Sequence, residues 1–283
     1  MTAVSPERIE GIAYREAVPE RWGEGGPAAL ALHGYPTSSY LWRNILPRLA
    51  DAGIHAIAPD LPGFGDSPAD PPGTWEHQIE HVERFRRALG LGRVALIVHD
   101  WGGLIGLRWA CDHPDAVSAL VIANTGFFPD GRWHGLAKTL QTEGEGEQVL
   151  ENMNRDLFAL GIRQVSPGLP DEAVDEFWKA YGDEQRRRSQ LELYRSGDFS
   201  KLEPYQGKLA ELDVPTLIIW GGKDQFAPVG GAYRFQKQIP GAKLTVLDDA
   251  GHFVMEDDPQ RVGAEIAEFL TAVPAGVGGG SSR

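Results

Sequence analysis

Three residues that can do nucleophilic or acid–base chemistry each follow an apolar run of strand length. Asp100 follows residues 94–99, Asp224 follows residues 215–220, and His252 follows residues 243–247. An aspartate after a strand is usually only a cap or turn residue. The three together, at the ends of separate strands and in the order nucleophile, acid, histidine, instead predict one catalytic group at the carboxyl edge of a parallel sheet.

The segment around Asp100 changes from a strand pattern to a helical pattern within two residues. Gly102 and Gly103 open the helical pattern, so Asp100 stands at the apex of a strand–turn–helix unit. This is the geometry of a nucleophile elbow. Serine elbows carry glycine two residues before the nucleophile, where this chain has Val98, and we expect the turn to find its space elsewhere.

A carboxylate nucleophile narrows the chemistry. Asp100 is ionised at neutral pH, whereas serine needs a base to remove its proton. Its attack on an ester would give a mixed anhydride, but displacement at a saturated carbon gives an alkyl–enzyme ester. The residue type therefore favours carbon–halogen or epoxide substrates. We expect His252, oriented by Asp224, to activate water for hydrolysis of that ester, with the backbone N–H groups of Tyr35 and Trp101 binding the oxyanion.

Two other histidines stand beside these motifs. We expect His99 to form a hydrogen bond with the backbone rather than to react. For His33 there are two interpretations, a brace for the oxyanion loop or an ordinary polar residue at a strand end.

The elements that must position these residues alternate between strand and helix patterns. Predicted strands cover 9–18, 28–32, 54–58, 94–99, 117–123, 215–220 and 243–247, and predicted helices cover 39–51, 75–90, 101–113, 229–239 and 259–272. This alternation predicts an α/β fold with a parallel, doubly wound sheet. It breaks at residues 129–212, where the patterns are only helical. We therefore expect an α/β core at 1–128 and 213–273, a helical cap at 129–212, and a flexible tail at 274–283.

Composition excludes several classes of protein. The net charge is −13 and no basic stripe offsets it, which argues against nucleic-acid or anionic-membrane partners. Cys111 is the one cysteine, so no internal disulfide is possible. We find neither a signal-peptide pattern nor an apolar stretch of membrane-spanning length, so we expect a cytoplasmic protein. No His, Cys or carboxylate cluster shows metal-ligand spacing, and we expect no metal or organic cofactor.

Two segments carry a family resemblance. His99-Asp100-Trp101-Gly102-Gly103 and residues 33–44 resemble the elbow and the loop after the third strand of haloalkane dehalogenases, a family of the α/β-hydrolase superfamily. The resemblance covers nearly the whole chain. It implies a mostly parallel eight-stranded sheet flanked by helices, an inserted helical cap, and a small halogenated substrate whose halide is bound by the Trp101 indole N–H.

The second halide donor is where the chain departs from that family. One dehalogenase subgroup has asparagine at the position of Tyr35, and another has glutamate there with a second tryptophan from the cap. Trp133 and Trp178 are the cap tryptophans of this chain. We expect Trp133 to be the second donor because it is nearer the strand end.

Epoxide hydrolases are the next closest resemblance, since they share the aspartate elbow and the histidine. They supply two cap tyrosines as acids. Tyr194 stands where the second is expected, but no tyrosine occurs between Trp101 and Lys179, and Tyr181 is a poor substitute. Tyr194 could then protonate an epoxide oxygen, face a halide or only pack. Two further alternatives are a cofactor-independent oxygenation, as in the coelenterazine-type luciferases that share this fold, and a binding protein on a hydrolase scaffold.

Overall fold

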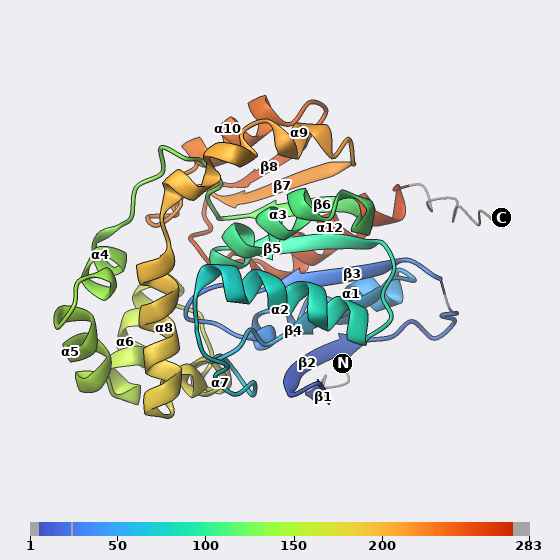
Figure 1. The fold of residues 1–283 in the computed structure, drawn as a ribbon. Coiled ribbons are helices and arrows are strands. Elements are labelled where there is room, and N and C mark those ends of the chain that lie inside the picture. The colour runs from blue at the N-terminus through green and yellow to red at the C-terminus, as the bar shows by residue number, and fades with distance from the viewer. Residues whose placement is uncertain (1–5, 24, 274–283) are drawn as a thin grey trace.

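The structure is a computed structural model and describes residues 6–23 and 25–273. These residues form one eight-stranded sheet with the order β1-β2-β4-β3-β5-β6-β7-β8, flanked by helices (Figure 1). The strands are β1 Glu7–Ile9, β2 Ile12–Ala17, β3 Ala28–Leu32, β4 His55–Pro59, β5 Val94–His99, β6 Val117–Ala123, β7 Thr216–Gly221 and β8 Lys243–Leu247. The pairs β1·β2 and β2·β4 are antiparallel and the other pairs are parallel. The predicted α/β class is confirmed.

The central strands are continuous apolar runs because both of their faces are covered. Every residue of β3, β4, β5 and β7 is buried, as expected for parallel strands between helical layers. The flanking helices are α1 Leu46–Asp51, α2 Trp75–Ala88, α3 Trp101–Asp112, α10 Gly230–Gln238 and α12 Pro259–Thr271. Helix α1 packs with α12, and α2 packs with α3.

The segment between β6 and β7 is helical. It contains α4 Gly135–Gln141, α5 Glu145–Asn152, α6 Arg155–Val165, α7 Asp171–Trp178, α8 Glu184–Ser196 and α9 Lys208–Glu211. Helices α4 to α8 gather at one end of the sheet (Figure 1). The absence of strands from residues 129–212, all of which are described, is as predicted. The expected flexible tail at 274–283 lies outside the described residues.

Two sequence expectations are wrong in detail, and one short helix was not predicted. Residues 9–18 are not one strand, because Glu10 and Gly11 both have positive φ and turn the chain into the β1–β2 hairpin. This is the backbone that two-residue hairpin loops require. Residues 39–51 divide into a 3₁₀ helix, Ser39–Trp42, and α1, which begins beside Pro47. The short helix α11, Val254–Asp257, was not expected.

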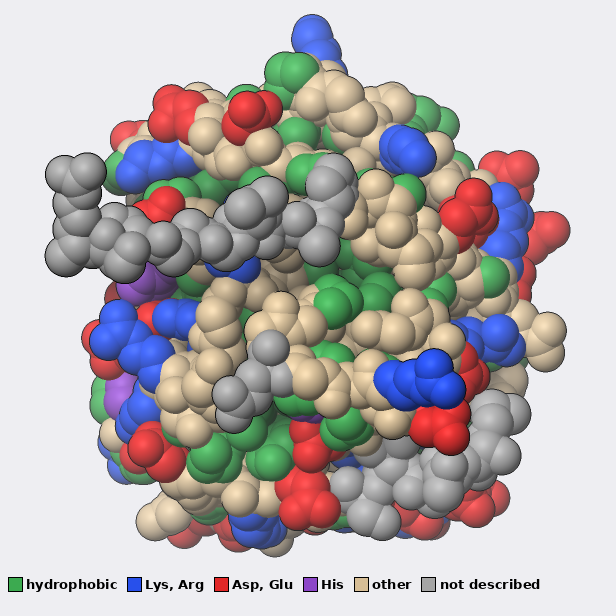
Figure 2. Space-filling view, turned by 90° about the vertical axis from the view of Figure 1, so that its right-hand side faces the viewer, with side chains coloured by type: hydrophobic (Ala, Val, Ile, Leu, Met, Phe, Trp, Pro, Cys, Tyr) green, Lys and Arg blue, Asp and Glu red, His purple; other side chains and the backbone are tan. Residues whose placement is uncertain are grey.

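Two surface properties bear on the predicted partners. Within the described residues, every helix is too short or too polar to cross a membrane. On the face turned away from the cap, the coloured basic and acidic side chains are interspersed rather than gathered by sign (Figure 2).

Candidate active site

Asp100 lies between β5 and α3 in a backbone conformation that side chains rarely adopt. Its φ is 51° and its ψ is −125°. Such a backbone conformation costs about 1–3 kcal/mol and persists only where neighbouring residues hold it in place. Its N–H donates to the Asn124 carbonyl oxygen at 3.2 Å. Its carbonyl oxygen accepts from Thr125 Oγ1 at 2.6 Å and from the Gly103 N–H at 2.9 Å. The segment after β6 therefore holds the predicted elbow in place.

Glycines on α3 let the elbow approach the sheet. A Cβ at Gly102 would collide with the Leu32 carbonyl oxygen, and one at Gly103 would collide with the Thr125 side chain. A Cβ at Gly106 would lie 2.8 Å from Val98 Cγ1. The space that serine elbows obtain from glycine two residues before the nucleophile is thus supplied here by Gly106, one turn into the helix.

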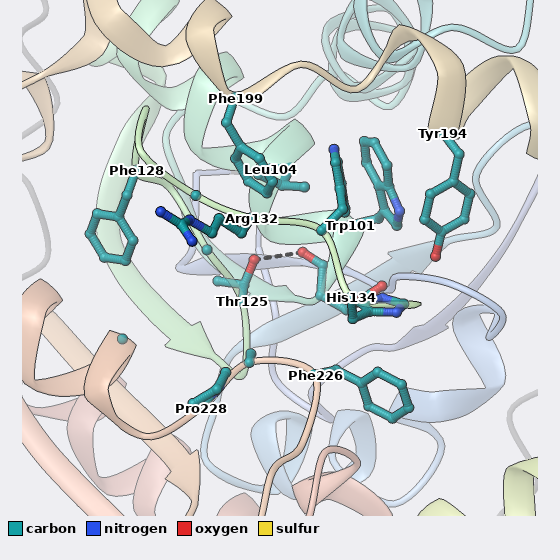
Figure 3. Close-up of a pocket in the computed structure, with 16 residues that line it drawn as sticks. Trp101, Leu104, Thr125, Phe128, Arg132, His134, Tyr194, Phe199, Phe226 and Pro228 are labelled. Carbon is teal, nitrogen blue, oxygen red and sulfur yellow. Dashed lines mark hydrogen bonds between the residues drawn. The ribbon is translucent and has the colours of Figure 1, made fainter. Parts of the chain in front are cut away.

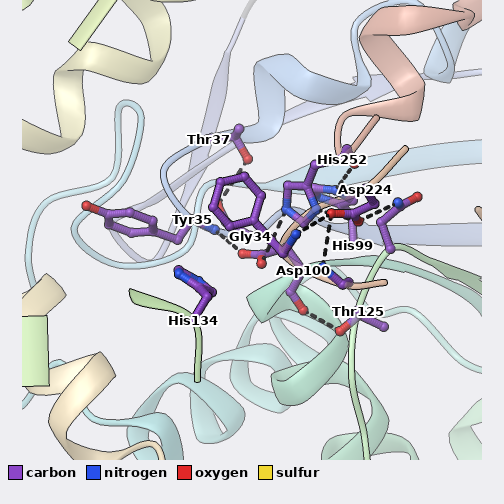
Figure 4. A network of polar contacts seen from close by, with 12 residues as sticks. Gly34, Tyr35, Thr37, His99, Asp100, Thr125, His134, Asp224 and His252 are labelled. Atoms are coloured by element: carbon purple, nitrogen blue, oxygen red, sulfur yellow. Dashed lines mark hydrogen bonds and ion pairs between the residues drawn. The ribbon is translucent and has the colours of Figure 1, made fainter. Parts of the chain in front are cut away.

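Asp100, Asp224 and His252 come together at the carboxyl ends of β5, β7 and β8 (Figure 4). His252 Nδ1 lies 2.8 Å from Asp224 Oδ2, and His252 Nε2 lies 3.4 Å from Asp100 Oδ2. Asp224 also accepts from Asn124 Nδ2 at 2.7 Å and from the Phe226 N–H at 2.7 Å. These bonds satisfy and fix the second carboxylate.

The opposite charges of His252 and the two aspartates, Asp100 and Asp224, stabilise one another. Burial alone would lower the pKa of His252, but the negative charges of Asp224 and Asp100 raise it to about 10. Burial alone would raise the pKa of Asp100, but the hydrogen bond and charge of His252 lower it to about 2. In this state Asp100 is an ionised carboxylate and His252 is an imidazolium.

Two backbone N–H groups also donate to the Asp100 carboxylate. The Tyr35 N–H donates to Asp100 Oδ1 at 2.7 Å, and the Trp101 N–H also donates to this carboxylate. These are the two donors expected for an oxyanion. The Tyr35 N–H binds Oδ1, whereas His252 lies beside Oδ2.

The histidines next to these motifs have structural contacts. His33 Nδ1 lies 2.9 Å from the Gly34 carbonyl oxygen, and its Nε2 accepts from the Leu61 N–H at 3.0 Å. It therefore braces the loop that carries the Tyr35 N–H. His99 Nε2–H donates to the His252 carbonyl oxygen at 2.8 Å, as expected for a histidine that bonds backbone.

A pocket of about 230 Å³ opens above Asp100 (Figure 3). The Asp100 side chain is 22% exposed, so a small molecule in the pocket can reach it. Residues from the cap and from α3 make most of its wall apolar and aromatic. Among them are Trp101, Leu104, Trp133, Tyr194 and Phe199, and the segments after β6 and β7 add Phe128 and Phe226.

The predicted leaving-group residues differ in how their polar atoms are bound. The buried Trp101 indole N–H has no hydrogen-bond partner of normal geometry among the described residues. The Trp133 ring stacks on Trp101 at 5.2 Å, and its N–H donates to the Gly197 carbonyl oxygen at 3.0 Å. Trp178 is absent from the pocket lining and stacks on Tyr181.

Tyr194 on α8 packs edge-on against Trp101, the neighbour of the nucleophile, with 5.3 Å between ring centroids. Burial and the charge of Asp100 raise the pKa of Tyr194 well above its usual value, and contact with the Trp101 indole opposes that rise. Tyr35 and Tyr181 are bound to each other by their hydroxyl groups at 2.8 Å. Of these three tyrosines, only Tyr194 lines the pocket.

Sequence reasoning missed several pocket residues, including His134, Arg132 and Phe226. His134 caps α4, with Nδ1 accepting from the Ala137 N–H at 3.4 Å. Burial lowers the pKa of His134. A histidine before a helix looks like a cap in sequence, and only tertiary packing brings it to the pocket.

The expectation that no residue group has metal-ligand spacing is wrong. Asp70, His77 and His81 each offer one ligand atom, and these atoms lie within 4.8 Å of one another. The two histidines occur four residues apart on the amphipathic helix α2, and the aspartate comes from the loop before it. The loop conformation was not readable from the sequence.

Comparison with known proteins places this geometry in a family. Residues 27–259 match the family model described as the alpha/beta hydrolase fold. The chain is 34% identical to a haloalkane dehalogenase of Mycobacterium marinum, over 87% of this chain and 84% of that protein. It is 28% identical to a cis-3-alkyl-4-alkyloxetan-2-one decarboxylase of Xanthomonas campestris (95% and 97% covered) and 29% identical to epoxide hydrolase 3 of Siraitia grosvenorii (87% and 92% covered).

A solved structure has the same fold as this chain. The haloalkane dehalogenase from Bradyrhizobium elkani superimposes with a TM-score of 0.80 at 25% identity, over 96% of this chain and 99% of that one. The chain belongs to the α/β-hydrolase fold family and is a hydrolase similar to the haloalkane dehalogenases.

Proposed function

We propose that this hydrolase cleaves a carbon–halogen bond through a covalent ester on Asp100. One observation carries the proposal. The elbow carboxylate accepts hydrogen bonds from two backbone N–H groups, one of them to Oδ1, and lines a small, mostly apolar pocket. In that pocket, the Trp101 indole N–H adjoins the nucleophile without a partner of normal geometry.

In the first step, Asp100 Oδ2 attacks the carbon that bears the halogen. A carbon–oxygen bond forms, the carbon–halogen bond breaks, and the halide leaves with the bonding electron pair. A halide in an apolar pocket needs N–H or O–H donors in place of water. The buried Trp101 indole N–H, beside the nucleophile, is such a donor.

In the second step, His252 acts as the base. Alkylation removes the charge of Asp100, which is one of the two charges that raise the pKa of His252. His252 then releases its proton to solvent and takes one from a water molecule that attacks Asp100 Cγ. The Tyr35 and Trp101 N–H groups stabilise the oxyanion at Oδ1. Collapse breaks the ester bond, and the alkoxide takes the proton from His252. The products are alcohol, halide and one proton.

For the second leaving-group donor, Tyr194 is better supported than Trp133. The Trp133 N–H is already bound to the Gly197 carbonyl oxygen. The Tyr194 hydroxyl contacts Trp101 and faces the charge of Asp100. A Tyr194→Phe variant removes only that hydroxyl, and we expect halide release to fall about tenfold.

An epoxide hydrolase is the second candidate. Its leaving group is an alkoxide, which needs an acid, and the same observation about Tyr194 favours it. The relatives named for epoxides and for oxetanones show that similar chains act on strained rings. Against this candidate, the hydroxyl groups of the two neighbouring tyrosines, Tyr35 and Tyr181, are hydrogen-bonded to each other.

One assay separates the candidates. The protein is incubated with 1,2-dibromoethane and, separately, with styrene oxide, and bromide and diol are measured. Bromide release that disappears in Asp100→Ala supports the dehalogenase. Diol without bromide overturns it in favour of an epoxide hydrolase. Neither product, with oxygen uptake on an aromatic substrate, points to the luciferase-like chemistry.

A further inference from the structure

Away from the pocket, α2 and the loop before it bring three ligand atoms together. His77 Nε2 and His81 Nε2 are 3.1 Å apart. Asp70 Oδ2 lies 2.9 Å from the His81 atom and 3.5 Å from the His77 atom. The two histidines share one face of the helix because they are four residues apart. None of the three residues lines the pocket above Asp100.

These three distances fit the coordination sphere of a small metal ion. A tetrahedral ion with bonds of about 2.0–2.1 Å has ligands about 3.3 Å apart, which the three distances bracket. An ion with such bonds to all three atoms would lie about 0.9 Å from their plane, leaving a fourth position for water. Two imidazoles and a carboxylate suit zinc and its neighbours. We propose that Asp70, His77 and His81 bind one divalent transition-metal ion of the zinc class.

The present hydrogen bonds show what the ion would replace. Arg84 Nη2 donates to His81 Nδ1 at 2.8 Å, so the proton of neutral His81 is on Nε2. The proton on His81 Nε2 is directed toward Asp70 Oδ2 and His77 Nε2, which both offer lone pairs to it. His77 Nδ1 lies 3.5 Å from a Glu80 carboxylate oxygen. A proton on Nδ1 faces that carboxylate and leaves the Nε2 atom of His77 as a hydrogen-bond acceptor.

Metal binding therefore requires that the His81 Nε2 proton and the Arg84 guanidinium leave their present positions. The His81 proton moves from Nε2 to Nδ1 through exchange with water, and Arg84 withdraws. The Arg84 side chain is 45% exposed, and Glu10 lies 3.8 Å from its Nε, so the guanidinium has an alternative partner. His81 is only 3% exposed, which holds one ligand in place before the ion arrives.

The position of the site points to stabilisation rather than catalysis. The loop that carries Asp70 also touches the cap. The Gly73 N–H donates to Glu192 at 2.6 Å, and Asp66 lies 3.0 Å from Lys179 Nζ. An ion between Asp70 and α2 would tie this loop to the core, and metal that binds the folded state alone stabilises it.

The test is calorimetric titration of chelator-treated full-length protein with zinc chloride, with thermal unfolding as a second readout. We expect one equivalent to bind and to raise Tm. His77→Gln and Asp70→Asn alter partly exposed side chains, and we expect both to lose binding and the Tm rise. His113→Gln, at the end of α3, is the matched control and should bind as the parent does.

Arg84→Gln gives the sharper result, because it removes the cation that competes for the site. We expect this variant to bind zinc more tightly than the parent. Absence of zinc binding in the parent, or equal binding in His77→Gln and Asp70→Asn, would overturn the proposal. Weaker binding in Arg84→Gln would contradict the exchange of the guanidinium for the ion.

Discussion

The two walls of the pocket are built differently. On the sheet side, Asp100 lines the pocket, and hydrogen bonds from backbone and side chains hold it and its partners His252 and Asp224. On the cap side, Trp133 and Tyr194 are held mainly by ring contacts, and the Trp101 N–H beside them lacks a normal partner. Under the proposed function, the sheet side would determine the reaction, and the cap side would determine which leaving group and substrate the pocket accepts. Changes on the sheet side should abolish turnover of every substrate, and changes on the cap side should alter preference.

The largest effect is expected for His252→Gln. This change removes the base for the second step but leaves Asp100 able to attack. Turnover should fall by at least about 10⁴-fold, while one equivalent of bromide is still released in a rapid burst. Intact-mass measurement should then find the alkyl group on the protein. Sustained turnover without such an adduct would mean that the residues of the sheet side do not determine the reaction, and the proposed difference between the two walls would be lost.

A smaller effect is expected where the walls meet. Trp101→Phe keeps an aromatic ring but removes the indole N–H, and halide release should fall about 10²-fold. Trp133→Phe is the matched change, and it removes an N–H bound to Gly197. Its effect on the rate should stay within about threefold after stability is taken into account. If the two variants lose similar activity, Trp133 is the second donor after all.

A separate effect concerns stability and pH rather than turnover. The pKa of His252 is about 10 in the folded protein and about 6.5 when unfolded. Between these values the folded state keeps a proton that the unfolded state has lost, so stability falls as pH rises. The fall from this residue should be at most about 1.4 kcal/mol per pH unit. Denaturant unfolding at pH 7 to 10 measures it, and His252→Gln should lack this part of the pH dependence.

Much of the sheet side was predictable because local signals coincide there. The strands Ala28–Leu32 and Val117–Ala123 match their predicted limits, since each is an apolar run bounded by polar or turn residues. The elbow followed from the change of pattern at Asp100. Gly106 could not be identified as the residue that makes room for Val98, because that contact depends on how α3 packs on β5.

The cap side was less predictable because its contacts are non-local. The bond from Trp133 to Gly197 joins residues 64 positions apart, and nothing in the spacing of tryptophans indicates it. Asp70 and His134 likewise depend on loop and cap packing. Its place near the strand end favoured Trp133 as the second donor and left Tyr194 open, whereas the bond from the Trp133 N–H to Gly197 now makes Tyr194 the better candidate.

Oxygen labelling in a single turnover tests the covalent ester most directly. Excess protein is mixed with 1,2-dibromoethane in ¹⁸O-water, and the peptide that contains Asp100 is analysed by mass spectrometry. Because water attacks Asp100 Cγ in the proposed second step, the label should enter the Asp100 carboxylate, and the alcohol from the first turnover should be unlabelled. Label in the alcohol with none in Asp100 would mean that water attacks the substrate directly, and it would contradict the nucleophilic role of Asp100.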